Sequence, residues 1–198
     1  GLIAQNLSSG YRHVSLTDDW GCVVADSIYI SENPEIQPTV SLVQTVSCYG
    51  NTDGIVSVSS FGGVGAHTFF WSIDPVGHTN NPDTVSGLAE GSYYVTTQDA
   101  LGCEVLDSIY VSEPDPLTMQ ATALAWISCY GADDGLAYAT AQGGNTPYTF
   151  TWSSNNQVGD TINTHTPGLE TVTVVDARGC TASDTVYMYE PDSLEIDI

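Results

Sequence analysis

Short segments in which apolar and polar residues alternate, or in which β-branched and aromatic residues gather, follow one another along the chain. Residues 54–59 (Gly-Ile-Val-Ser-Val-Ser) and 93–97 (Tyr-Tyr-Val-Thr-Thr) are two examples, and both patterns are typical of β-strands. Turn-forming residues separate the segments about every 8–12 positions, as in a β-sandwich. The pattern predicts strands near residues 39–47, 54–60, 67–73, 83–86, 91–98 and 104–112.

The chain also repeats itself at a constant spacing. The sequence Ser47–Gly54 returns as Ser128–Gly135, and Cys129 follows Cys48 by 129 − 48 = 81 positions. A Gly-Gly pair and a tryptophan further along return at the same spacing, so the same strands are expected twice. A repeat of about 80 residues has the size of a small β-domain and is too long for one turn of a solenoid. We therefore predict an all-β chain of tandem Ig-like β-sandwich modules.

Prolines mark the expected module boundaries, because proline cannot donate to a sheet ladder. The second module is shorter by four residues, and we place the deletion opposite the Gly-Ser-Tyr-Tyr segment at 91–94. The mid-strand residues Trp71 and Trp152 are expected in the two cores. The predicted organisation is residues 1–34 as the C-terminal half of a truncated module, 35–114 and 115–191 as complete modules, and 192–198 as the first strand of a following module.

The charge balance changes which partners are expected. The chain has 2 basic and 24 acidic residues, for a net charge of −22, and its only cations besides histidine are Arg12 and Arg178. A surface this acidic repels nucleic acid and anionic membranes, so neither is an expected partner. No run of 18 apolar residues occurs, so membrane insertion is not expected either. Acidity of this kind keeps an extracellular protein soluble, and it also favours Ca²⁺.

The repeated motif is Cys-x-Gly-x-x-Asp-Gly, then Gly-Gly, Pro-Tyr-x-x-x-Trp, Gly-Leu and Asp-x-x-Gly-Cys. This motif resembles the SprB repeat of giant surface adhesins in gliding Bacteroidetes. The first module departs from it with Ala66-His67 in place of Pro-Tyr. The second module matches it at Cys129, Gly131, Asp134, Gly135, Gly143, Gly144, Pro147, Tyr148, Trp152, Gly168, Leu169, Asp176, Gly179 and Cys180. The resemblance implies an Ig-like, type IX-secreted protein of the cell surface that acts in adhesion or gliding motility.

Five cysteines follow the repeat, and a secreted protein is expected to pair them. The first choice is one disulfide within each module, Cys48–Cys103 and Cys129–Cys180, with the partner of Cys22 outside the chain. In a standard Ig strand order, however, the turns that hold the two cysteines of one module lie at opposite ends. Cys48 would then approach Cys180 and link neighbouring modules, and free thiols are a third alternative. Zinc is not expected, because no Cys-x-x-Cys occurs.

Repeated aspartates suggest calcium as the one candidate cofactor. The simpler explanation for the Asp-Gly pairs is a tight turn in which glycine takes a positive φ. Alternatively, acidic side chains near the module ends bind Ca²⁺, although no complete Asp-x-Asp-x-Asp loop is present. The candidate ligands are Asp53, Asp99, Asp107, Asp134, Asp176 and Asp184.

Catalytic motifs do not account for the repeat. No Gly-x-Ser-x-Gly, His-Glu-x-x-His or glycine-rich phosphate loop occurs, and the four histidines fall at non-equivalent positions. The chain is therefore not expected to be an enzyme.

The resulting hypothesis is a structural and adhesive segment of a large surface adhesin or filament, in which disulfide-stapled sandwiches form a stiff stalk. The alternative is a set of carbohydrate-binding modules of a secreted protein or hydrolase, which use Tyr29, Tyr110 and Tyr187 at one repeated position. The expected partners are a surface polysaccharide or other copies of the chain, and the exposed strand edges also allow strand sharing between chains.

Overall fold

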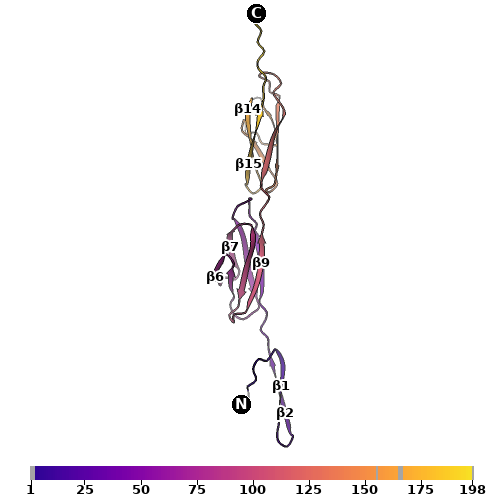
Figure 1. Ribbon diagram of the computed structural model, residues 1–198, viewed down its shortest axis with the longest axis vertical. Coiled ribbons are helices and arrows are strands. Elements are labelled where there is room, and N and C mark those ends of the chain that lie inside the picture. The colour runs from indigo at the N-terminus through magenta and orange to yellow at the C-terminus, as the bar shows by residue number, and fades with distance from the viewer. Residues whose placement is uncertain (1–2, 155, 165–166, 198) are drawn as a thin grey trace. The chain divides into compact units, whose positions relative to one another are not determined.

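A computed structural model describes residues 3–154, 156–164 and 167–197. Every regular element in these residues is a β-strand (Figure 1), which confirms the all-β prediction. Within the same residues, no helix exists that could cross a membrane. The strands are β1 Gly10–Thr17, β2 Val23–Ile30, β3 Gln37–Gln44, β4 Gly54–Phe61, β5 Thr68–Trp71, β6 Asp74–His78, β7 Asp83–Leu88, β8 Gly91–Gln98, β9 Glu104–Val111, β10 Thr118–Ala125, β11 Gly135–Gln142, β12 Thr149–Trp152, β13 Thr161–Thr164, β14 Gly168–Val175 and β15 Thr181–Met188.

The strands of the described residues form several sheets. β1 and β2 make an antiparallel two-stranded hairpin, in which Gly10 lies opposite Ile30 and Thr17 lies opposite Val23. The next strands form the sheets β3-β4-β7 and β6-β5-β8-β9, and the last six form β10-β11-β13 and β12-β14-β15. The paired strands whose register is known are all antiparallel. The order of strands therefore repeats along the chain, as the spacing in the sequence predicts.

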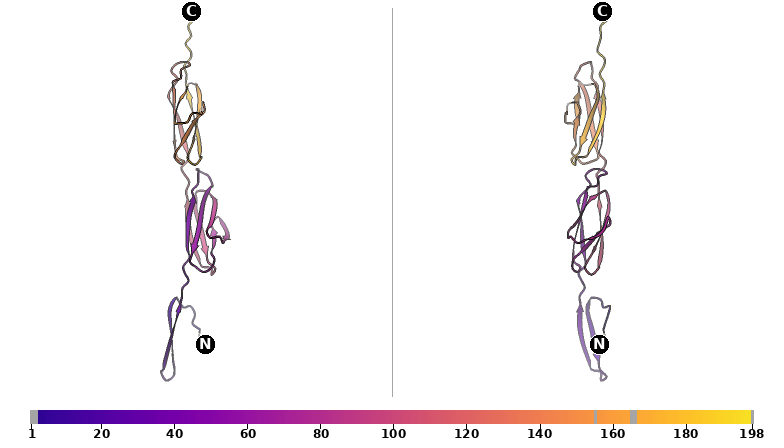
Figure 2. Two further views of the ribbon diagram at one scale, coloured as in Figure 1. Left: turned by 180° about the vertical axis from the view of Figure 1, so that it is seen from behind. Right: turned by 90° about the vertical axis from the view of Figure 1, so that its left-hand side faces the viewer.

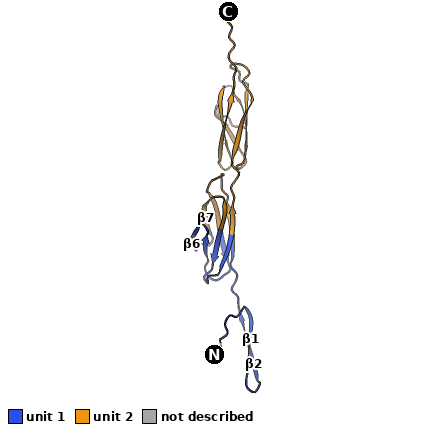
Figure 3. Ribbon diagram, in the orientation of Figure 1, with its two compact units in different colours: residues 1–39, 58–83, 94–107 blue, residues 40–57, 84–93, 108–198 orange. Residues whose placement is uncertain are grey.

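The contacts divide the chain into two compact units (Figure 3). Unit 1 comprises residues 1–39, 58–83 and 94–107, and unit 2 comprises residues 40–57, 84–93 and 108–198. The hairpin β1–β2 belongs to unit 1, and the strands β10–β15 belong to unit 2. The tandem modules with boundaries at 34, 114 and 191 stay a prediction.

The sheets β10-β11-β13 and β12-β14-β15 enclose an apolar core in unit 2 (Figure 2). Alternate residues of β11 and β14 point inward, as the period of two in a half-buried strand requires. Trp152 is fully buried at the centre of this core, and its indole N–H donates to the Gly159 carbonyl oxygen at 2.9 Å. The core residues are Ala137, Ala139, Trp152, Ile162, Val172, Val174, Val186 and Met188.

The tryptophan of the first repeat is buried as well. Trp71 is only 2% exposed, and its indole N–H donates to the Asp83 carboxylate at 2.9 Å. Asp83 is itself buried and lies 3.4 Å from a ring nitrogen of His78. Both tryptophans thus satisfy their polar atom inside the fold, and their expected place in the core is confirmed.

Two details of the sequence prediction are wrong, and one is untested. β6 occupies residues 74–78, in the gap between the strands predicted at 67–73 and 83–86; a bulge between Phe69 and Trp71 lets this short strand pair with β5. The tail forms no strand in residues 193–197, and residue 198 lies outside the described residues; the assignment of residues 192–198 to the first strand of a following module stays a prediction. Leu194 is fully exposed there, because no neighbouring strand pairs with the tail in the described residues.

The second error is the place of the four-residue deletion. Gly91 opens β8 and Gly168 opens β14, and both strands have eight residues. Gly91 follows Trp71 by 91 − 71 = 20 positions, whereas Gly168 follows Trp152 by 168 − 152 = 16. The missing residues therefore fall before β14, in the stretch that includes β6 in the first repeat. For the same reason, Gly168-Leu169 is not the structural counterpart of Gly87-Leu88. Leu88 is 3% exposed, whereas Leu169 is 71% exposed.

Candidate functional site

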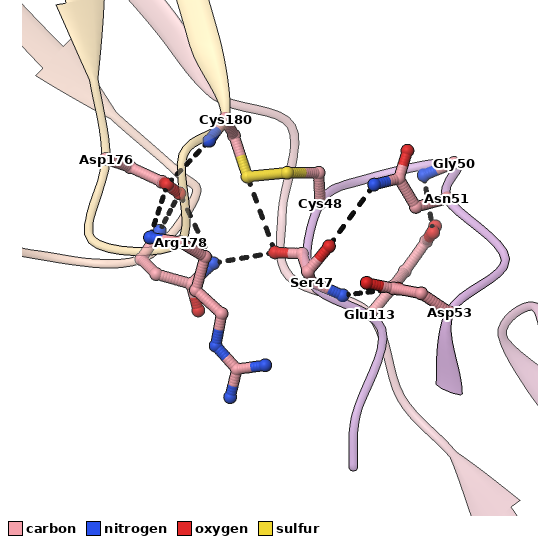
Figure 4. The surroundings of a disulfide bond; sticks show 10 residues. Ser47, Cys48, Gly50, Asn51, Asp53, Glu113, Asp176, Arg178 and Cys180 are labelled. Carbon is pink, nitrogen blue, oxygen red and sulfur yellow. Dashed lines mark hydrogen bonds between the residues drawn. A yellow bond between two sulfur atoms is a disulfide. The ribbon is translucent and has the colours of Figure 1, made fainter. Parts of the chain in front are cut away.

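A disulfide joins Cys48 to Cys180 in unit 2 (Figure 4). Their Cα atoms are 5.7 Å apart, within the usual range for a disulfide, and 132 positions separate them in the sequence. The bond connects two local structures that both recur in the chain. We call residues 47–54 and their copy 128–135 the cysteine loops, and residues 176–180 and their copies 99–103 and 18–22 the aspartate turns. The bonded pair of loop and turn is called the joint.

Hydrogen bonds within the first cysteine loop hold Cys48 in place. The Asp53 carboxylate accepts from the Ser47 amide at 2.9 Å, and the Asn51 amide donates to the Cys48 carbonyl at 3.0 Å. The Gly50 amide donates to the Glu113 carboxylate at 2.7 Å, which ties the loop to the residues after β9. Hydrogen bonds from the Ser47 side chain and amide hold the pKa of Asp53 below its usual value.

The second cysteine loop has the same geometry without a disulfide. The Asp134 carboxylate accepts from the Ser128 amide at 2.9 Å, and the Ala132 amide donates to the Cys129 carbonyl at 3.0 Å. The Gly131 amide donates to Glu190 at 2.7 Å, as Gly50 does to Glu113. The conformation of the loop is therefore set by its own sequence and does not depend on the disulfide.

The aspartate turn is built around one carboxylate. Asp176 Oδ1 accepts from the amides of Arg178 and Cys180 at 2.8 and 2.9 Å, and Oδ2 accepts from the Asn145 amide at 2.7 Å. The Asp176 amide donates to the Cys180 carbonyl at 3.0 Å. Desolvation, the largest influence, would raise the pKa of Asp176, but the hydrogen bonds from Asn145, Cys180 and Arg178 together outweigh it and lower the pKa.

The other two aspartate turns repeat this hydrogen bonding. Asp99 Oδ1 accepts from the amides of Leu101 and Cys103, both at 2.9 Å, and Asp18 Oδ1 accepts from those of Trp20 and Cys22 at 2.9 and 2.8 Å. A glycine precedes the cysteine in each turn, and its φ is +85° at Gly21, +82° at Gly102 and +86° at Gly179. This conformation favours glycine. The motif Asp-x-x-Gly-Cys thus encodes one rigid turn that presents a cysteine.

Two further contacts cross the joint. The Asn145 side-chain amide donates to the Ser47 carbonyl oxygen at 3.0 Å, and it also donates to Asp176 Oδ2 at 3.3 Å. The Cys180 sulfur lies 3.4 Å from the same Ser47 oxygen. Arg178 adds a smaller electrostatic contribution to the low pKa of Asp53, so one of the two arginines of the chain acts across the joint.

The first-choice disulfides Cys48–Cys103 and Cys129–Cys180 are wrong, and the alternative Cys48–Cys180 is the one that forms. Cys180 lies directly before β15, whereas the loop of Cys129 contacts residues 189 and 190 directly after it. Eight strand residues span about 25 Å, too far for a disulfide. Likewise, Cys103 directly precedes β9, and the loop of Cys48 contacts residues 112 and 113 after it. Cys22, Cys103 and Cys129 are exposed free thiols.

The calcium candidates all interact with other groups of the fold, and five of the six accept hydrogen bonds from backbone amides. Besides the four carboxylates described above, Asp184 accepts from the Ala121 and Thr185 amides at 2.9 and 2.8 Å, which lowers its pKa. Asp107 is engaged as well. Across the described residues, no three His, Cys, Asp or Glu side chains are grouped so that they could hold a metal ion. These contacts favour the simpler explanation of tight turns, and calcium binding stays an untested prediction.

The three candidate tyrosines have different surroundings. Tyr29 packs edge-to-face on Tyr11 in the hairpin, with ring centroids 5.0 Å apart, and the Tyr110 hydroxyl donates to Glu90 at 2.5 Å. This bond raises the pKa of Tyr110. Tyr187, in contrast, lines a shallow apolar hollow with two other aromatic residues. The repeated position is exposed in each case, but it does not produce one repeated binding surface.

The hollow beside Tyr187 contains two residues that the sequence did not single out. Trp126 and Tyr189 are 64% and 50% exposed, and their ring centroids are 6.0 Å apart in an edge-to-face arrangement. We call Trp126, Tyr187 and Tyr189 the aromatic cluster. The repeat could not reveal it, because the equivalent positions in the first repeat are Thr45 and Ser112.

The departure from the motif at Ala66-His67 has a structural explanation. In the second repeat, the Tyr148 hydroxyl donates to the Gly143 carbonyl oxygen at 2.5 Å. In the first repeat, His67 Nε2 lies 3.1 Å from the equivalent Gly62 oxygen. Histidine thus replaces tyrosine as the partner of the Gly-Gly turn, and this buried histidine has a structural role.

The Gly-Gly turn itself gives a prediction with a matched control. Gly143 and Gly131 have φ values of +78° and +76°, so alanine at either position costs about 1–2 kcal/mol in backbone strain. A Cβ at Gly143 would also collide with the Pro116 carbonyl oxygen, whereas a Cβ at Gly131 meets nothing within 4 Å. We expect Gly143→Ala to lose about 1–3 kcal/mol more than Gly131→Ala in chemical denaturation. Equal losses would show that the close approach has no energetic effect.

The aspartate turn predicts how stability depends on pH. Because the pKa of Asp176 is lower in the folded chain than its ordinary value of 3.8, its contribution to stability is complete above pH 3.8. This contribution is lost as the pH falls through the folded-state pKa. We expect Asp176→Asn to have a lower melting temperature at neutral pH and a smaller further decrease on acidification than the wild type. Asp133→Asn, which makes the same charge change in a cysteine loop, is the control and should keep the wild-type pH profile.

The fold and the joint define an all-β chain with recurring loops and turns, of which one loop and one turn are linked by a disulfide. Residues 127–157 of this chain match the SprB repeat, which confirms the resemblance in the sequence over these residues. Comparison with curated proteins gives no match.

Several solved structures are distantly similar to this chain. The C-terminal 282-residue fragment of intimin, solved with the intimin-binding domain of its translocated receptor, is 14% identical over 78% of the chain, with a TM-score of 0.42. The chain spans 64% of the length of that fragment. The amphioxus IgVJ-C2 molecule is 15% identical, with 80% of this chain and 98% of that chain covered and a TM-score of 0.32. The surface layer protein SbsC, domains 4–9, is 16% identical, with 92% and 35% covered and a TM-score of 0.24. Likenesses this distant do not indicate a function.

Proposed function

We propose that the chain is an extracellular structural and adhesive segment of a large bacterial surface protein, built from tandem Ig-like modules. The observation that carries this proposal is the joint, because it links one copy of the repeated sequence to the next by a covalent bond. Disulfides persist in oxidising surroundings such as the cell surface. In this role the chain performs no catalysis, and its modules serve as a stiff stalk.

Three further observations support this role. Residues 127–157 match the SprB repeat. The resemblance of the chain to that family implies type IX secretion and a part in adhesion or gliding. The net charge of −22 keeps such a surface soluble and disfavours nucleic acid. The hydrogen-bonded turns on both sides of the disulfide limit motion at the joint, because they are held by side chains of the folded repeats.

Antibody labelling of intact cells of the source organism tests the location and the role together. We expect an antibody raised against the purified chain to label unpermeabilised cells, and its Fab fragment to reduce their attachment to a surface. Labelling that requires permeabilised cells would refute the proposal. A Fab fragment that labels the surface but leaves attachment and gliding unchanged would refute the adhesive part of it.

Small-angle X-ray scattering tests the stiffness. The oxidised chain should give a narrow distribution of particle sizes, and Cys48→Ser with Cys180→Ser should broaden it, because the linker Glu113–Pro116 would then be the only covalent connection. Cys103→Ser is the matched control, since it removes a thiol that has no partner. Identical distributions for all three proteins would contradict a stiffening role of the joint.

A second candidate function is carbohydrate binding at the aromatic cluster. Its three exposed rings line one shallow hollow, and aromatic faces of this kind are suited to stacking on sugar rings. A glycan array should then show binding that Trp126→Ala removes and that Tyr110→Ala, a candidate outside the cluster, leaves unchanged. Binding that Tyr110→Ala removes instead would assign the sugar site to the repeated tyrosine.

A further inference from the structure

The aromatic cluster is an exposed surface that the fold holds in place at the end of β15. Trp126, Tyr187 and Tyr189 are each at least half exposed, and together they line one shallow hollow. The Ile127 amide donates to the Tyr189 carbonyl oxygen at 3.0 Å, which fixes the segment of the tryptophan beside the end of the strand. The three rings therefore keep their positions without a ligand.

The sequence supplies almost no cations that could cover these rings. The faces of aromatic rings attract the cationic side chains of Lys and Arg, but this chain has no lysine, and its only cations besides histidine are two arginines. Arg178 lies at the joint before the start of β15, whereas Tyr187 lies near the far end of this eight-residue strand, about 25 Å away. Arg12 belongs to unit 1, where its guanidinium donates to nearby carbonyl oxygens. The rings are therefore open to a cation from outside the chain.

Carboxylates lie beside the cluster. Glu190 directly follows Tyr189, and its carboxylate accepts from the Gly131 amide at 2.7 Å, so its charge is held next to the rings. Asp134, in the same cysteine loop as Gly131, is bonded to Ser128, whose side chain and amide hold the pKa of Asp134 below its usual value. Both carboxylates are charged at neutral pH, and fixed negative charge of this kind raises the local concentration of cations.

We propose that the aromatic cluster binds a saccharide whose sugar rings carry free amino groups. This inference rests on the carbohydrate binding proposed above and names the class of sugar. An aromatic face stacks on the apolar face of a sugar ring, and its quadrupole also attracts an ammonium group. A neutral sugar would make only the first of these interactions, and the net charge of −22 would repel an anionic sugar.

A saccharide fits this surface better than a basic peptide does. A peptide strand that pairs with the end of β15 needs free backbone carbonyls, and the Tyr189 carbonyl already accepts from the Ile127 amide. The hollow is also too shallow to enclose the flexible stem of a lysine, whose ordering costs conformational entropy. A sugar ring is rigid and loses less on binding.

The first repeat has the same carboxylate without the aromatic cluster. Glu113 accepts from a loop amide at 2.7 Å, as Glu190 does in the second repeat. Thr45 and Ser112, however, stand in the positions of the tryptophan and the second tyrosine. Glu113→Gln is therefore a matched control for Glu190→Gln, because both changes remove one charge and keep an oxygen that can accept from the loop amide.

The experiment measures the binding of the full chain to soluble oligomers of glucosamine and of N-acetylglucosamine of equal length by isothermal titration calorimetry. The pH is mildly acidic, so that the amino groups of the first oligomer are charged, whereas the acetyl groups of the second remove this charge. We expect the glucosamine oligomer to bind at least about tenfold more tightly in dilute buffer. This difference should shrink as the salt rises from about 0.01 M to about 1 M, because the Debye length falls from ~30 Å to ~3 Å.

Three variants locate the site. Trp126→Ala should remove the binding of both oligomers and keep the wild-type melting temperature, because the side chain is exposed. Glu190→Gln should weaken the binding of the glucosamine oligomer about two- to fivefold in dilute buffer and leave that of the N-acetylglucosamine oligomer unchanged. Glu113→Gln should change neither.

Each other result has a definite meaning. Equal affinity for the two oligomers would overturn this inference and leave carbohydrate binding standing. Glucosamine binding that survives Trp126→Ala would show that the net charge attracts the oligomer without the aromatic cluster. Tighter binding of a lysine oligomer of equal charge would assign the cluster to a basic peptide. Absence of binding to both sugars would refute this inference and the carbohydrate-binding function together.

Discussion

Replacing Cys48 and Cys180 together by serine is expected to lower the free energy of unfolding by about 5 kcal/mol, because the bond closes a loop with a sequence separation of 132. The stabilisation comes mainly from the unfolded chain, whose freedom the cross-link restricts. Both cysteines must be replaced, since a single substitution would leave one more free thiol, which an added oxidant such as oxidised glutathione could link to Cys103 or Cys129.

Thermal and chemical unfolding of the oxidised proteins measure this loss. Cys129→Ser is the matched control, because it makes the same chemical change in a loop of the same geometry that has no disulfide. Its unfolding should follow the wild type, and addition of a reductant should bring the wild type down to the double variant. A double variant as stable as the wild type would mean that the joint adds nothing to the stability of the folded chain.

Trp152→Ala is expected to have the second large effect, a loss of about 3–5 kcal/mol. The side chain is fully buried between the two sheets of unit 2, among Ala137, Val172 and Met188. Its removal leaves a cavity that the surrounding strands cannot fill, and it also leaves the Gly159 carbonyl without its indole donor.

Two other substitutions help to interpret this loss. One separates the contribution of side-chain volume from that of the hydrogen bond, and the other tests the effect of burial. Trp152→Phe keeps most of the apolar volume and should cost less than Trp152→Ala. Trp126→Ala removes the same side chain from a site that is 64% exposed, so its effect should be within about 0.5 kcal/mol of zero. Urea denaturation of the three variants gives the comparison. A similar cost for Trp126→Ala and Trp152→Ala would contradict the assignment of Trp152 to the core.

Local features were predictable from the sequence because each depends on nearby residues. The alternation in 54–59 indicated β4, and the predicted mid-strand position of Trp152 indicated the core. The turns around Cys48 and Cys180 are also local, since Asp53 and Asp176 bond to amides only a few positions away. Their recurrence made the candidate site visible without a structure, since the cysteine loops return after 81 positions and the aspartate turns after 99 − 18 = 81 and 176 − 99 = 77 positions.

The pairing of the cysteines was not predictable in this way. The sequence allows both Cys48–Cys103, the first choice, and Cys48–Cys180, and the choice depends on which end of β9 and β15 each turn occupies. The aromatic cluster was missed for a similar reason, because Trp126 and Tyr189 are 189 − 126 = 63 positions apart and meet where the Ile127 amide donates to the Tyr189 carbonyl. Such information lies in the strand order and not in any short stretch of residues.

The joint also determines how the chain responds to a pulling force. When its two ends are pulled apart, tension passes directly from Cys48 to Cys180 through the S–S bond, so residues 49–179 carry no load while the bond is intact. The linker Glu113–Pro116 and Trp152 lie inside this shielded stretch, whereas the core residues Val186 and Met188 lie outside it. Stretching can then extend only the segments outside it, and a reductant would release the hidden length as one additional step in a single-molecule force trace.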